Sequence, residues 1–82
     1  MLGDALYSKD LIDEAIAEYR EALRINPGDA YAHFNLGSAF SKKALVAEAI
    51  VAFENFIKYA PPQYASDVDT AMGIIRKLKG QR

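Results

Sequence analysis

The stretch that decides the fold is residues 30–63, AYAHFNLGSAFSKKALVAEAIVAFENFIKYAPPQ. Two runs in it carry apolar or small residues at helical spacing, and the prolines at its end disfavour helix in the residue before them. We therefore expect helices over about 30–42 and 45–59. The predicted inward stripe of the first helix is His33, Leu36, Gly37, Phe40 and Ala44, and that of the second is Val46, Ala49, Ile50, Phe53 and Ile57.

Most of this pattern also occurs 34 positions earlier, over residues 2–27, which indicates an internal repeat. Leu2-Gly3 recurs as Leu36-Gly37, and Glu14-Ala15-Ile16 recurs as Glu48-Ala49-Ile50. Three further pairs share this offset: Tyr19 with Phe53, Leu23 with Ile57, and Pro27 with Pro61. Agreement at one offset over small, aromatic and proline positions is typical of a repeated supersecondary unit.

The flanking segments also follow helical patterns. Residues 11–25 form one apolar face, with Asp10 as the expected N-cap, and a turn over 26–29 places Asp29 to cap the next helix. A short helix is expected over 2–8 and a last one over 66–78, whose stripe is Val68, Ala71, Met72, Ile75 and Leu78. The sequence thus predicts an all-α fold of antiparallel helical hairpins stacked as a short α-solenoid.

Composition narrows the function classes. The 82 residues allow a single domain, and the net charge of −1 argues against nucleic acid and anionic membranes as partners. There is no cysteine and one histidine, so we expect no metal and no cofactor. We favour a cytoplasmic location, although the absence of cysteine is equally compatible with the periplasm.

Residues 30–63 resemble the tetratricopeptide repeat, a helix–turn–helix unit of 34 residues, at Leu36-Gly37, Phe40, Ala49, Phe53 and Pro61. His33 stands where the family usually has tryptophan. The resemblance divides the single domain 1–82 into a truncated first repeat (1–29), a second repeat (30–63) and a capping helix (64–82).

Two departures from the family pattern leave an alternative open. The family often has glycine between the two helices of a unit, whereas this chain has Asp10 and Ala44 there. Residues 41–48 contain no helix breaker, so the two helices could continue as one and exchange between copies. The shortened first repeat could also leave an apolar face that self-associates. Homo-oligomerisation is therefore the alternative function.

The resemblance implies a non-catalytic protein–protein interaction scaffold, because the first helix of each unit in this family lines a groove that takes peptides. The groove positions are Asp4, Tyr7, Tyr31, Phe34, Asn35, Ser38, Ser41 and Lys42. Exposed aromatic rings would supply apolar area, and amide and hydroxyl groups would bond the peptide backbone. Equally, Tyr31 and Phe34 could simply pack against neighbouring helices.

Other activities find no support in the sequence. Of the clamp with which some family members hold a C-terminal carboxylate, only Asn35 is present, while Asp4 and Asp69 would repel that group. We therefore expect a neutral, basic or aromatic peptide. No arrangement around His33 provides a nucleophile with an oriented base, so the chain is not expected to be an enzyme.

Overall fold

The computed structural model describes residues 11–80, and this part of the chain contains helices and no strand. The helices are α2 (Ile12–Ile25), α3 (Ala30–Lys42), α4 (Val46–Tyr59) and α5 (Ala65–Gly80), with a 3₁₀ turn, η1 (Pro62–Tyr64), before α5. The expected all-α class is confirmed, and both ends of each of these four helices fall within two residues of those expected. The short helix expected over 2–8 and the cap at Asp10 lie outside the described residues.

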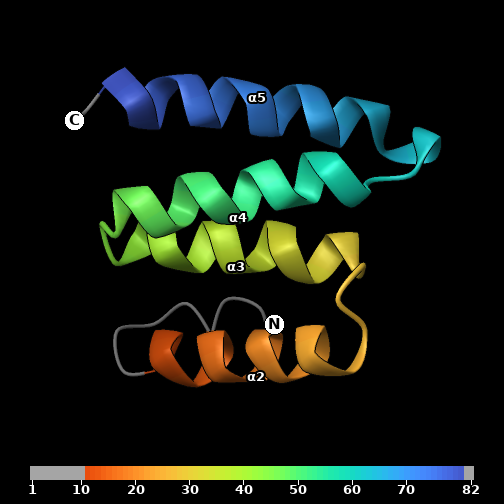
Figure 1. Ribbon diagram of the computed structural model, residues 1–82. Coiled ribbons are helices and arrows are strands. Elements are labelled where there is room, and N and C mark those ends of the chain that lie inside the picture. Colours follow the sequence, from red (N-terminus) through yellow and green to blue (C-terminus); the bar gives the residue numbers. More distant parts are fainter. Residues whose placement is uncertain (1–10, 81–82) are drawn as a thin grey trace.

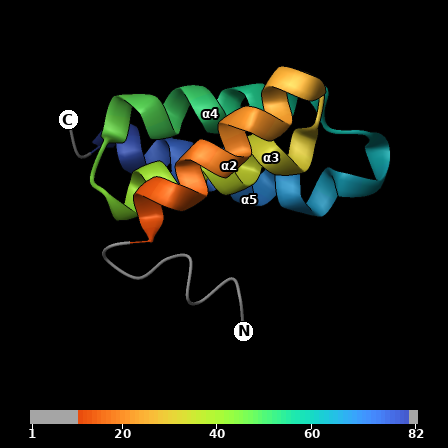
Figure 2. The same ribbon diagram turned by 90° about the horizontal axis from the view of Figure 1, so that it is seen from below.

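The helices follow one another in space in the order in which they follow along the chain (Figure 1). Successive helices run in opposite directions, so that α2 and α4 share one direction and α3 and α5 share the other. In the view turned by 90°, α4 lies on one side of the stack and α3 and α5 lie on the other (Figure 2). This is the expected stack of antiparallel hairpins.

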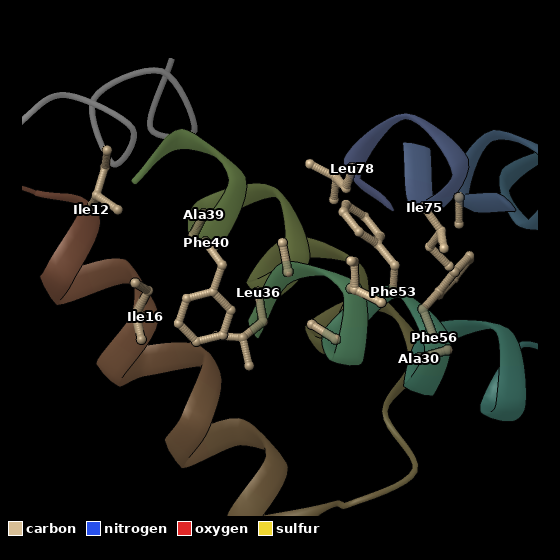
Figure 3. Close-up of a cluster of buried hydrophobic side chains, with 14 residues drawn as sticks. Ile12, Ile16, Ala30, Leu36, Ala39, Phe40, Phe53, Phe56, Ile75 and Leu78 are labelled. Atoms are coloured by element: carbon tan, nitrogen blue, oxygen red, sulfur yellow. The ribbon is translucent and has the colours of Figure 1, made fainter. Parts of the chain in front are cut away.

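The core is built at the crossing of α3 and α4, where small residues lie next to rings (Figure 3). Phe53 and Phe56 are the largest fully buried side chains, each 1% exposed. Ala49 is fully buried on the same helix, and a Cβ built at Gly37 would lie 2.9 Å from atoms of the Phe53 ring. α3 and α4 therefore approach each other closely where Gly37 meets Phe53.

The turn between α2 and α3 is fixed by polar contacts. The carboxylate of Asp29 accepts a hydrogen bond from the backbone N–H of Ala32 at 3.2 Å, which confirms the predicted cap. His33 is buried, its Nε2 lies 3.0 Å from the carbonyl oxygen of Pro27, and its ring stacks on that of Tyr59. The imidazole therefore ties the α2–α3 turn to the end of α4.

The α3–α4 turn shows that the expected inward position of Ala44 was wrong, and it excludes one continuous helix over α3 and α4. Ala44 was expected on the inward stripe of α3, but it is exposed and adopts a left-handed φ of 60°. The backbone N–H of Leu45 bonds the carbonyl of Phe40 at 2.9 Å, and that of Ala44 bonds Ser41 at 3.0 Å. This is the Schellman arrangement that normally ends a helix with glycine. The chain therefore turns here, and α3 and α4 are two helices, not one.

Two other expectations about the core need correction. Met72, expected on the inward stripe of α5, is 46% exposed, because the buried line of that helix runs through Ala71, Ile75 and Leu78. Phe56 was absent from the predicted stripe of α4 but lies at the centre of the core. No helix among residues 11–80 combines the length and apolar character that crossing a bilayer demands.

Candidate functional site: the uncovered face of α3

Six residues of α3 are left at least partly uncovered by its neighbours, and they are the six positions that the sequence predicted for this helix. The other seven residues of α3 are buried. Helical spacing places the six side by side along the helix, and we refer to them as the α3 face. The α3 face consists of Tyr31, Phe34, Asn35, Ser38, Ser41 and Lys42.

Tyr31 forms the open aromatic end of the α3 face. Its side chain is 53% exposed, and its ring meets the edge of Tyr64 with the ring centroids 5.2 Å apart. Tyr64 belongs to η1 and packs in turn against Phe56, at 6.5 Å between centroids. The α3 face thus continues onto η1, which the sequence prediction did not include. The signal was the double proline, which holds the chain in a tight turn beside α3.

Phe34 mainly packs against the core. Its ring makes edge contacts with Phe53 and Phe56, at 5.5 and 5.0 Å between centroids, and it is only partly exposed. Of the two interpretations of the aromatic pair, packing against a neighbouring helix describes Phe34, whereas Tyr31 keeps a free surface. The ring of Phe34 therefore forms the floor beside Tyr31 and connects the α3 face to the core.

The middle of the α3 face carries polar groups with unused hydrogen-bonding capacity. The amide of Asn35 and the hydroxyls of Ser38 and Ser41 make no hydrogen bond to any side chain or backbone group within residues 11–80. No buried side-chain N or O in this part of the chain lacks a partner, so these groups keep contact with solvent. Lys42 is exposed at the far end. Such donors and acceptors can bond a peptide backbone laid along the helix.

The remaining predicted site residues, Asp4 and Tyr7, lie outside the described residues. Within residues 11–80, no three or more His, Asp or Glu side chains are grouped so as to hold a metal ion. The histidine in this part, His33, is committed to Pro27 and Tyr59 in the core. The α3 face is thus a surface of rings, amide and hydroxyls.

Comparison with known proteins agrees with this arrangement of helices. A family model described as "TPR repeat" matches residues 3–43, and another described as "Tetratricopeptide repeat" matches residues 30–63. The chain is 35% identical, over 60 residues, to the tetratricopeptide repeat domain-containing protein PYG7, chloroplastic, of Arabidopsis thaliana. The alignment covers 73% of this chain and 20% of the relative, so the chain corresponds to about one fifth of that protein.

Proposed function

Because this chain belongs to the tetratricopeptide repeat family, we propose that it is a non-catalytic module that binds a peptide segment of a protein partner along the α3 face. Repeats of this family generally mediate protein–protein interaction. The observation that carries the proposal is that every residue of α3 is either buried in the stack or belongs to one continuous face.

The chemistry of the α3 face suits a peptide. Tyr31 offers a half-exposed ring held in place by Tyr64, so an apolar or aromatic side chain of the peptide can pack there with little loss of side-chain entropy. One turn along the helix, the amide of Asn35 can donate to a peptide carbonyl and accept from a peptide N–H. Ser38 continues the polar line. The expected ligand is a neutral, basic or aromatic peptide.

The proposal is tested by selecting ligands from a displayed peptide library with the whole chain and measuring the affinity of the winning peptide by fluorescence anisotropy. Tyr31→Ala and Asn35→Ala should each weaken binding by about 1–3 kcal/mol, because each removes a central contact. The library includes peptides with acidic C-terminal carboxylates, which should not be enriched.

The matched control is Val51→Ala. Val51 is 56% exposed, as accessible as Tyr31, but it lies on α4 and lines a hollow that contains no residue of the α3 face. Its removal should leave the affinity unchanged. Binding that survives both Tyr31→Ala and Asn35→Ala but disappears with Val51→Ala would place the peptide elsewhere and overturn the proposal.

A further inference from the structure

A second surface lies between α2 and α4, where a hollow of about 410 Å³ opens to solvent. Its floor is apolar and comes from α3, through Leu36 and Phe40. One wall is α2, with Arg20 and Leu23, and the other is α4, with Glu48, Val51 and Asn55 among its residues. None of these residues belongs to the α3 face, so this hollow is separate from the proposed peptide site.

The two polar side chains on the α4 wall of the hollow have no partners within residues 11–80. The side chains of Glu48 and Asn55 make no hydrogen bond or ion pair with any of residues 11–80. The guanidinium of Arg20 lies over the ring of Phe40, 5.6 Å from its centroid, and forms no ion pair in this part of the chain. Val51 stands between them with 56% of its surface exposed. The hollow therefore combines an apolar centre with an unpaired carboxylate, an unpaired amide and a guanidinium that has an aromatic ring beside it but no carboxylate.

The solvent side of α5 carries the complementary chemistry. Asp69, Met72 and Arg76 are all exposed and are spaced three and four residues apart, so they line one face of the helix. Neither Asp69 nor Arg76 has a hydrogen-bond or ion-pair partner within the described residues. Gly73 lies beside Met72, and the space where its Cβ would be is open, so another surface can approach closely.

The two sets of residues match in spacing as well as in charge. Glu48, Val51 and Asn55 on α4 are also three and four residues apart, and each set spans about 10 Å of helix at 1.5 Å per residue. If α4 and an α5 helix laid along it run antiparallel, Arg76 faces Glu48 at one end and Asp69 faces Asn55 at the other. Met72 then faces Val51 and the apolar floor of the hollow. Arg20 on α2 is 34 positions, or one repeat, before Glu54 on α4. Because α2 and α4 run in the same direction, Arg20 lies at the end of the hollow that Asp69 of the second helix faces.

From this complementarity we propose that the hollow between α2 and α4 binds α5 of a second copy of the chain. Met72 of one copy fills the apolar centre of the other, with Asp69 and Arg76 paired at its two ends. The hollow and α5 are different surfaces of each copy, so the contact is heterologous. Repeated from copy to copy, this contact yields either a closed ring, in which every hollow holds an α5 helix, or an open head-to-tail series. This inference does not depend on the proposed peptide site.

Sedimentation of the whole chain at increasing concentration tests the proposal. The mean mass should rise above that of the monomer between about 10 μM and 1 mM, the range expected for a small contact of this kind. Arg20→Glu and Asp69→Lys should each weaken association by about fivefold to tenfold, because each change brings two like charges together across the contact. A chain that stays monomeric to 1 mM would overturn the proposal.

Mixing the two charge-reversed chains supplies the decisive test. The Arg20→Glu chain keeps an intact α5 and the Asp69→Lys chain keeps an intact hollow, so the mixture should associate more strongly than either variant does alone. A reversal of charge on another face of α5 provides the control. Lys77 is five residues from Met72, which turns it away from the face of Asp69, Met72 and Arg76, so Lys77→Glu should leave association unchanged. Association that is unchanged by Arg20→Glu, or a mixture that associates no more strongly than either variant alone, would show that these surfaces do not meet.

The apolar centre is tested separately from the charges. Met72→Ala should weaken self-association about tenfold, since it removes the side chain that fills the hollow. Circular dichroism at low concentration checks that every variant keeps its helices, which is expected because Met72, Asp69 and Arg20 are exposed. Undiminished association of the Met72→Ala chain would contradict the proposed mode of packing.

Discussion

The backbone of α3 at Gly37 lies directly against the ring of Phe53, because a Cβ at position 37 would be 2.9 Å from three atoms of that ring. Phe53 is 1% exposed and is held by the edge of Phe34, so its ring has no space into which to move. The distance between α3 and α4 is therefore set by the absence of a side chain at Gly37.

Gly37→Ala should accordingly destabilise the fold. Overpacking of this kind costs about 1–3 kcal/mol, which outweighs the gain of about 1 kcal/mol from replacing a helical glycine. The matched control is Gly73→Ala in α5, where nothing lies within 4 Å of the added Cβ. That change should stabilise by up to about 1 kcal/mol. Urea unfolding at low concentration measures both, and equal effects of the two changes would contradict this account.

Phe53→Ala should remove most of the stability of the domain. The ring is fully buried at the α3–α4 crossing, so its loss leaves a cavity and should cost about 3–5 kcal/mol. Val51→Ala, on the exposed side of the same helix, should cost well under 1 kcal/mol. Thermal unfolding followed by circular dichroism separates the two. A nearly unchanged melting temperature for the Phe53→Ala chain would disprove the assigned core.

Ala44→Gly should stabilise the protein. Ala44 holds a φ of 60° in the turn that ends α3, and a left-handed conformation costs a residue with a Cβ about 1 kcal/mol relative to glycine. The hydrogen bonds of the turn are backbone bonds and remain. Urea unfolding should show a higher midpoint for the Ala44→Gly chain and a lower one for Ala44→Val. The opposite order would mean that the turn is not left-handed.

Asp29→Ala should destabilise by about 0.5–2 kcal/mol, because the carboxylate caps the backbone N–H of Ala32 at the start of α3. Asp29→Asn serves as the control, since its side-chain oxygen can accept the same hydrogen bond. The two variants should therefore differ by most of the Asp29→Ala loss when compared by chemical unfolding. Equal losses would indicate that charge, not the hydrogen bond, is what matters at this position.

The sequence predicted the architecture well because the repeat supplies two independent copies of the same pattern. The Asp29 cap could be predicted from the turn over 26–29, and the exposed positions of the α3 face could be predicted from helical spacing. The last segment has no second copy in the chain, so its buried face was predicted from helical spacing alone, which fits Ala71 and Met72 equally well. Met72 was consequently placed inside, although it is exposed.

The other omissions have local physical causes. Ala44 is a poor residue for a left-handed turn, so its type gave no indication that it leaves the inward stripe of α3. The backbone hydrogen bonds of the Schellman turn and the packing of Leu45 against the core hold it in place. Phe56 lies one turn beyond Phe53 and becomes central only because Phe34 and Tyr64 converge on it. That convergence depends on tertiary packing, which apolar spacing alone does not specify.

The order in which α2, α3, α4 and α5 contact one another has a consequence for unfolding. Because each helix packs mainly on its neighbours along the chain, α5 can detach without breaking the α3–α4 crossing, and α2 can do the same. Backbone amides of α5 should therefore exchange their hydrogens for deuterium sooner than those around Phe53. Pulled from both ends, such a chain should come apart by successive peeling toward its middle hairpin.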